Sequence, residues 1–234
     1  MKRLPAGPSA GRATTATVVA AVLALLAGCT SLGRPVPLIR DALDYGPPAT
    51  VRVCLLVDDS VPAERVAAVV DGLNAEFAPF GLAVTVPWTR PWQRPGYTRG
   101  PIIRGLRTVE LESPCDRVVA LVGRHLGDHA WALLLPQVLG AVELSTRTHG
   151  YVVIGDRLSR LAPQAVANHE FYHLLGCREG DSMPRCYRMI AELKRRIPPG
   201  ADFLPGIDRA GRYLLTREAA NEALRTAAAA GRAR

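Results

Sequence analysis

The sequence predicts an α/β or α+β domain with a mixed, twisted sheet, an active-site helix and a small C-terminal helical part. Three observations lead to this fold class. Apolar runs rich in β-branched residues, at 51–58 and 118–122, predict buried strands. Between the first run and a short strand predicted at 82–86, apolar residues recur at the spacing of a helix. This gives strand–helix–strand alternation. Two further strands within 138–154 then precede a predicted helix at 156–176.

The first 28 residues predict a signal peptide. Basic residues precede an apolar stretch at 17–27, which is too short to span a bilayer permanently. The stretch ends in Leu-Ala-Gly-Cys at 26–29, which resembles the lipobox of bacterial lipoproteins. The resemblance implies that Cys29 is acylated, for example with palmitate, and anchors the chain to a membrane. Because Thr30 follows and not aspartate, sorting to the periplasmic side of the outer membrane is expected if two membranes are present.

The remaining chain is predicted to be a tether and one domain. Residues 29–49 are rich in proline and glycine and predict a tether, and 50–234 predict a single domain. The leader holds three of the 29 basic residues and none of the 21 acidic ones, which leaves 26 against 21 and a net charge of +5. No cluster of basic and aromatic residues appears, so nucleic-acid binding is not expected.

The first half of the domain predicts one helix and several strands. Ser60 is expected to cap a helix that has Pro62 in its first turn and ends before Pro79. Four prolines and four arginines make 87–105 a predicted loop, and 106–111 is predicted to be a short strand.

The second half predicts a strand pair and three helices. The two strands of 138–154 should meet at a turn near 148–150, which places His149 in that turn. Apolar spacing predicts helices at 156–176 and 184–197, and an alanine-rich helix is expected at 218–234.

Cysteine usage fits an exported protein. With Cys29 acylated, Cys54, Cys115, Cys177 and Cys186 remain, and four cysteines in an oxidising compartment predict two disulfides. Three connectivities are possible. A local pair of Cys177 and Cys186 would leave Cys54 with Cys115, whereas a buried free thiol is the alternative for Cys54.

The stretch His-Glu-Phe-Tyr-His at 169–173 is the strongest functional signal. On a helix, His169 and His173 lie one turn apart and face the same way, the geometry two imidazoles need to share one zinc ion. Glu170 can reach a zinc-activated water without binding the metal, and so can act as general base in hydrolysis. A surface helix with two solvated histidines is the alternative, but the flanking residues are too apolar for it.

The residues after the motif resemble the metzincin signature of zinc metallopeptidases. Gly176 occupies the glycine position of that signature, and Glu179 stands where the family has its third histidine. Snapalysin-like relatives have aspartate there, and archaemetzincins and snapalysins also place Cys then Met downstream, here Cys186 and Met189. The resemblance implies a zincin-like peptidase with His169, His173 and Glu179 as ligands. Its edge strand, at about 138–146, would bind extended peptide.

Alternatives to this ligand set remain open. Glu192 has the spacing of the gluzincin third ligand, and Asp181 is a further option. If 184–197 is one helix, Met183 and not Met189 would lie under the metal. Histidines in Arg-His-Leu-Gly-Asp-His, at 124–129, have metal-like spacing, but the glycine argues for a loop.

The interpretation that unites these features is a lipid-anchored, extracytoplasmic zinc peptidase that hydrolyses peptides or proteins. The alternative is a non-catalytic envelope lipoprotein that keeps a zincin fold as a binding or assembly module. The unusual third ligand keeps that alternative open.

Overall fold

The computed structural model describes residues 35–124, 138–154 and 163–232. Contacts divide the chain into two compact units, Met1–Ser31 and Leu32–Arg234, and all described residues belong to the second. The predicted signal peptide and Cys29 lie outside the described residues, as do His125 and His129. Within the described part, no helix is long and apolar enough to cross a membrane.

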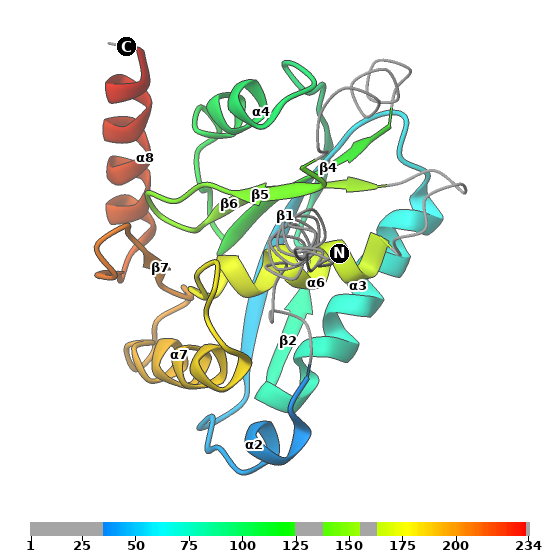
Figure 1. Ribbon diagram of the computed structural model, residues 1–234. Coiled ribbons are helices and arrows are strands. Elements are labelled where there is room, and N and C mark those ends of the chain that lie inside the picture. The colour runs from blue at the N-terminus through cyan, green and yellow to red at the C-terminus, as the bar shows by residue number, and fades with distance from the viewer. Residues whose placement is uncertain (1–34, 125–137, 155–162, 233–234) are drawn as a thin grey trace, which may run out of the picture. The chain divides into compact units, whose positions relative to one another are not determined.

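A mostly parallel sheet forms the centre of this unit (Figure 1). Its strands are β1 (Ala49–Val57), β2 (Leu82–Thr85), β3 (Thr89–Pro91), β4 (Arg117–Gly123), β5 (Gly140–Val142) and β6 (His149–Ile154). They run in the order β2, β1, β4, β6, β5, and β3 pairs with the second half of β1. Only β5 is antiparallel to its neighbour among these strands, and in the described chain it ends the sheet.

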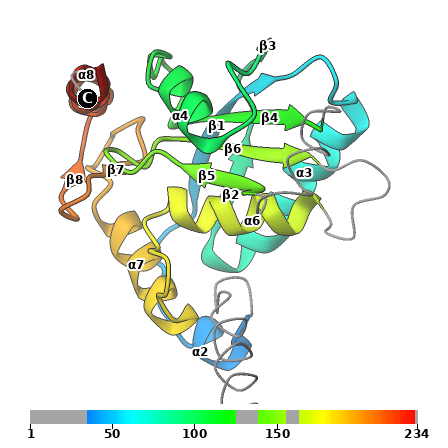
Figure 2. The ribbon, with the colours of Figure 1, turned by 45° about the horizontal axis from the view of Figure 1, so that its top comes forward.

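Helices cover both faces of the sheet (Figure 2). The other elements are α2 (Pro37–Asp41), α3 (Ala63–Phe77), η1 (Ala78–Phe80), α4 (Arg99–Leu106), α6 (Pro163–Leu174), α7 (Met183–Arg195), β7 (Gly206–Ile207), β8 (Tyr213–Leu214) and α8 (Arg217–Arg232). Helices α3 and α6 pack on one face, and α4 packs on the other. Alternate residues of β1 enter opposite cores: Val53 and Leu55 join the first, Cys54 and Leu56 the second. Because both faces of β1 are buried, its sequence is a nearly continuous apolar run.

Several sequence predictions are confirmed with small shifts in their bounds. The strands expected at 51–58, 82–86 and 118–122 are β1, β2 and β4. The helix expected at 184–197 is α7, and the C-terminal helix is α8. Of the helix expected at 156–176, the described part is α6.

The region between β2 and β4 is where the prediction was wrong. The expected loop at 87–105 contains β3 and most of α4, and Leu106 ends that helix, so 106–111 is not a strand. Gly100 and Gly105 are poor helix formers, so helix propensity alone does not predict α4. Burial of Ile102, Ile103 and Leu106 against the sheet supplies the stabilisation that propensity lacks.

Local corrections concern a cap and a turn. Ser60 does not cap α3: Pro62 is the N-cap residue, and the Ser60 hydroxyl donates to Asp58 Oδ1 at 2.6 Å. His149 is not in the turn but begins β6, and the turn occupies 143–148. Burial lowers the pKa of His149 to about 4, and its ring nitrogens contact Thr148 and Val109. This histidine is therefore a neutral core residue.

The described part of the expected tether at 29–49 packs against the domain. Residues 37–41 form α2, β1 begins at Ala49, and Tyr45 is only 7% exposed with its ring 5.1 Å from that of Phe80. The part of this segment from α2 onward thus belongs to the folded domain.

Two disulfides form with the expected connectivity. Cys54 is joined to Cys115 and Cys177 to Cys186, so the free-thiol alternative for Cys54 is wrong. The first links β1 to the segment before β4, and the second links the turn after α6 to α7.

The two disulfides should contribute unequally to stability. Their sequence separations are 61 and 9 residues, and the longer loop restricts the unfolded chain more. We expect Cys54→Ala/Cys115→Ala to lower the free energy of unfolding by about 4 kcal/mol and Cys177→Ala/Cys186→Ala by about 2.5 kcal/mol, measured by urea unfolding. A larger loss from the short loop would contradict the chain-entropy explanation.

Candidate metal centre

The two histidines of the motif lie on α6 and converge. Their ring centroids are 4.8 Å apart, and the two Nε2 atoms are 3.1 Å apart. The spacing of four residues places both rings over the same turn of the helix, as the sequence predicted. His173 is 7% exposed, whereas His169 keeps more contact with solvent.

A hydrogen bond sets the tautomer of His173. Its Nδ1 lies 2.8 Å from the carbonyl oxygen of Cys177, which can only accept, so Nδ1 carries the proton. The lone pair of Nε2 is then left to face His169 and Glu179. A metal-binding histidine commonly has this arrangement, with one nitrogen donating to a carbonyl.

Glu179 completes a group of three possible ligands. Its Oε1 lies 3.2 Å from Nε2 of His173 and 3.9 Å from Nε2 of His169. Two ligands on a tetrahedral zinc with bonds of about 2.0–2.1 Å are about 3.3 Å apart. The distances from His173 to His169 and to Glu179 are close to this value, whereas the 3.9 Å between His169 and Glu179 is wider. Among the described residues, these three form the one group of histidine, cysteine or carboxylate side chains whose possible ligand atoms all lie within 4.8 Å of one another.

The turn after α6 brings Glu179 back over the histidines. Gly176 has φ 108°, a conformation that side chains rarely adopt, and a Cβ there would lie 2.5 Å from Ile207 Cδ1. Arg147 donates to the carbonyl oxygens of Gly176 and Cys177. The disulfide between Cys177 and Cys186 also links this turn to α7.

The rival ligands are engaged elsewhere. Asp181 accepts from the backbone N–H of Arg178 at 2.7 Å and pairs with Arg185 at 3.1 Å, so it shapes the loop that carries Glu179. Glu192 lies on α7 and pairs with Arg195 and Arg196 at 3.0 and 2.7 Å.

The methionines are placed by α7, which is one continuous helix. Met189 lies inside it and Met183 is its first residue, which favours Met183 for a position under the metal. That assignment remains a prediction.

Glu170 lies beside the edge strand. A Cβ at Gly140 would lie 2.5 Å from Glu170 Cγ and 2.7 Å from its Oε1, so only glycine leaves room for this carboxylate. Glu170 is 7% exposed. Burial, followed by the charge of Glu179, raises its pKa to about 8, while Arg99 acts in the opposite direction.

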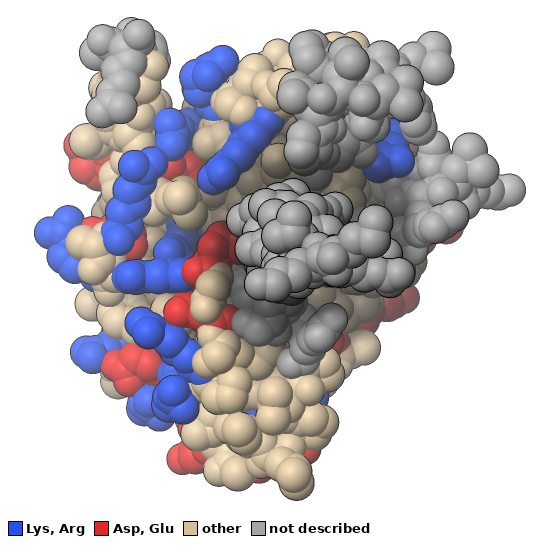
Figure 3. Space-filling model, viewed as in Figure 1, with Lys and Arg blue, Asp and Glu red and all other residues tan. Residues whose placement is uncertain are grey.

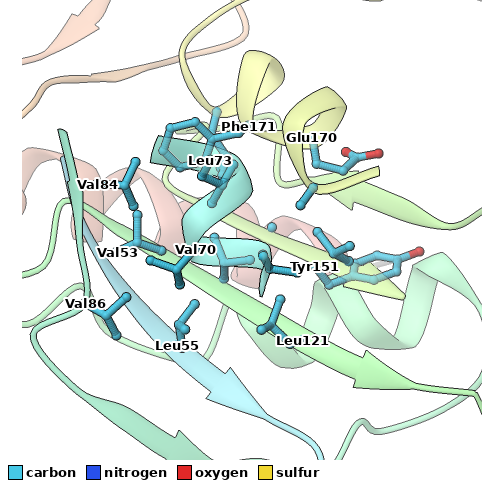
Figure 4. Close-up of a pocket in the computed structure, with 16 residues that line it drawn as sticks. Val53, Leu55, Val70, Leu73, Val84, Val86, Leu121, Tyr151, Glu170 and Phe171 are labelled. Carbon is cyan, nitrogen blue, oxygen red and sulfur yellow. The ribbon is translucent and has the colours of Figure 1, made fainter. Parts of the chain in front are cut away.

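Glu170 also belongs to the lining of an apolar cavity (Figure 4). It lies between the sheet and helices α3 and α6, and valine, leucine and phenylalanine side chains supply most of its lining. The Glu170 carboxylate lies at one end and points away from these side chains. None of the described residues that line the cavity is cationic, so no lining side chain offsets the desolvation of the carboxylate.

Strand β5 has an open edge next to Glu170. Its inward hydrogen bonds include Val153 N–H to Leu139 O and Glu143 N–H to His149 O. In the antiparallel alternation, Gly140 and Val142 therefore direct their N–H and C=O groups away from β6. Within the described chain no strand pairs with that edge.

Comparisons with known proteins give distant structural likenesses. No protein-family model matches the chain, and no curated protein matches its sequence. One similar solved structure is described as a chaperone–substrate complex, with 12% identity over 79% of this chain and a TM-score of 0.45, and this chain spans 38% of its length. Another is archaemetzincin from Methanopyrus kandleri, with 20% identity over 63% of this chain and 94% of that chain, and a TM-score of 0.38. At such TM-scores the function rests on the geometry of this chain.

The raised pKa of Glu170 predicts a pH dependence in the metal-free protein. Its pKa rises from 4.5 to about 8, so the folded chain holds this proton more tightly than the unfolded chain between those values. The free energy of unfolding should therefore fall as pH rises through that window, by up to about 1.4 kcal/mol per pH unit. Glu170→Gln should flatten the decline, measured by urea unfolding in the presence of a chelator. An equal decline in both proteins would assign the dependence to other groups.

Proposed function

We propose that this protein is a zinc-dependent peptidase, anchored in the cell envelope through an acylated Cys29. The observation that carries the enzymatic part is the convergence of His169, His173 and Glu179 at zinc-ligand spacing. A carboxylate that is not in this group, Glu170, lies next to them and beside an open strand edge. A ligand group, a separate base and a place for extended peptide are the parts that peptide hydrolysis needs.

The residues take distinct roles in this proposal. His169, His173 and Glu179 would hold the ion, which when bound lowers the pKa of water and polarises a carbonyl group. Glu170 would accept a proton from the attacking water on its carboxylate and deliver it to the leaving amide nitrogen. A poorly solvated carboxylate with a raised proton affinity suits both halves of that transfer.

The open edge of β5 supports extended peptide as the substrate. The outward N–H and C=O groups of Gly140 and Val142 can form ladder hydrogen bonds with a substrate strand. Because Gly140 also adjoins Glu170, a peptide on this edge would pass directly beside the general base.

A non-catalytic binding module is the second candidate. The observation that favours it is the third ligand: Glu179 stands where the resembling family has histidine, and its side chain is 73% exposed. Such a protein would bind zinc and peptide but not cleave the peptide. Turnover therefore separates the two candidates.

Zinc content and peptide turnover test the site together. We expect His169→Ala and His173→Ala to lose stoichiometric zinc, because each removes a nitrogen donor. Glu170→Ala should keep zinc but lose about 10²–10⁴-fold in kcat for a peptide library or casein, because base and proton donor are lost together. Metal analysis and initial rates give both readouts.

Three carboxylate variants identify the third ligand. Glu179→Ala should weaken zinc strongly, whereas the matched control Glu192→Ala should not, since Glu192 pairs with Arg195 and Arg196 on α7. Asp181→Ala removes no ligand but loosens the loop that carries Glu179, so it should weaken zinc less than Glu179→Ala does. Zinc loss from Glu192→Ala alone would make the site gluzincin-like. If wild-type protein binds no zinc, the enzyme proposal fails. If it binds zinc and peptide without turnover, the binding-module function takes its place.

Gly140→Ala should impair turnover without removing the metal. The added methyl group would overlap Glu170, which must shift away from the position beside the substrate edge. We expect kcat to fall at least about 10-fold, since small displacements of catalytic groups can cost that much, with zinc content unchanged. Gly100→Ala is the control, because its Cβ would meet only the end of the Arg104 side chain, at 3.3 Å. Equal activity of both variants would remove Gly140 from the proposed site.

A further inference from the structure

The short helix α2 presents apolar side chains to solvent. Leu38 is 89% exposed, Ile39 is 40% exposed and Val36, which precedes the helix, is 36% exposed. No residue of α2 is buried. In Figure 3 the lower end of the molecule, where Figure 1 places α2, is mainly free of charged side chains. An exposed apolar surface of this kind marks a place of contact with a partner or a membrane.

Helix α2 is fastened to the domain. The backbone N–H of Val36 donates to the Tyr187 hydroxyl on α7 at 2.9 Å. Helix α2 also contacts α7 and η1, and the chain that follows it buries Tyr45 against Phe80. The exposed apolar side chains therefore belong to a surface of the domain.

Chain length places this surface near the membrane if Cys29 is acylated. Cys29 and Val36 are seven positions apart in the sequence. Even a fully extended chain advances only about 3.3–3.6 Å per residue, so the reach is at most about 25 Å. An acylated Cys29 lies at the bilayer surface, and so α2 cannot be far from it.

We propose that the surface formed by Val36, Leu38 and Ile39 rests in the interface of the bilayer and sets the orientation of the domain. This inference depends on the proposed acylation of Cys29 but not on peptidase activity. The anchor supplies the affinity, and the apolar surface removes the rotational freedom that a tether alone would leave. Figures 1 and 2 place α8 at the other end of the described chain from α2, so α8 would point away from the membrane.

Local charge indicates an apolar contact. Arg40 is paired with Asp41 at 2.8 Å, and Asp44 adds a second negative charge nearby. Among the described residues of this surface, positive charge is therefore not in excess and does not attract anionic lipid. Its contact with the bilayer should persist at high salt, unlike the contact of a polybasic surface.

Site-specific fluorescence on the full-length lipoprotein tests the orientation. Leu38→Cys would be labelled with an environment-sensitive fluorophore, and the matched control is Leu215→Cys, since Leu215 is an exposed leucine just before α8. The four other cysteines of the mature domain are in disulfides, which leaves one reactive thiol in each variant once Cys29 is acylated. The proteins are reconstituted into phosphatidylethanolamine–phosphatidylglycerol vesicles that carry a nitroxide-labelled lipid.

We expect the nitroxide lipid to quench the label at position 38 several-fold more than the label at 215. Aqueous iodide should quench the label at 215 more than the label at 38. High salt should leave both differences in quenching unchanged. Equal quenching at the two positions, or loss of the difference at high salt, would overturn the proposal.

Flotation of wild type and Cys29→Ser with the same vesicles tests separately whether Cys29 is acylated and anchors the protein. If wild type does not float, the anchor and this inference both fail, whereas zinc binding and peptide turnover of the same samples report on the enzyme.

Discussion

The hydrogen bonds of two buried arginines to the last residue of α6 and to the turn that follows it are the interaction on which the site depends. Arg117, on β4, donates to the carbonyl oxygens of Leu174 at 3.2 Å and Leu204 at 2.9 Å. Arg147 donates to those of Gly176 and Cys177. The last carbonyl groups of a helix lack partners within it and carry partial negative charge, so a buried guanidinium satisfies them by hydrogen bonding and by electrostatics. Burial lowers the pKa of Arg117 to about 10, which still leaves it charged at neutral pH.

These bonds connect the sheet to the geometry of the ligands. The Cys177 carbonyl oxygen accepts from Arg147 and also lies 2.8 Å from Nδ1 of His173. The turn that fixes the histidine tautomer is thus the turn that leads to Glu179. Arg147 itself has φ 53°, an uncommon conformation for a residue with a side chain, and it directs the guanidinium under the turn. Strain that is kept beside a candidate metal site fits a functional constraint better than an accident of packing.

The sequence predicted the parts of the site that depend on local spacing and missed those that depend on long-range packing. His169 and His173 are recognisable because a helix has a fixed period, and β1 and β4 because strands buried on both faces read as apolar runs. Gly140 gave no signal, since its role appears only when β5 lies against α6. The arginines that hold the turn were also missed, because an arginine in a sequence normally predicts a surface position. Helix α4 was missed because tertiary burial overrides its weak propensity.

The shortness of β5 limits the risk that an open strand edge carries. An exposed edge can pair with any extended chain, which is useful for a substrate and hazardous with a second copy of the protein. Here the edge strand has only three residues and begins with a glycine, so it offers few outward hydrogen-bonding groups. After β5, Glu143 turns the chain by accepting from the N–H groups of Ser145 and Thr146. The same brevity that limits unwanted pairing confines the open edge to the residues next to Glu170, the proposed general base.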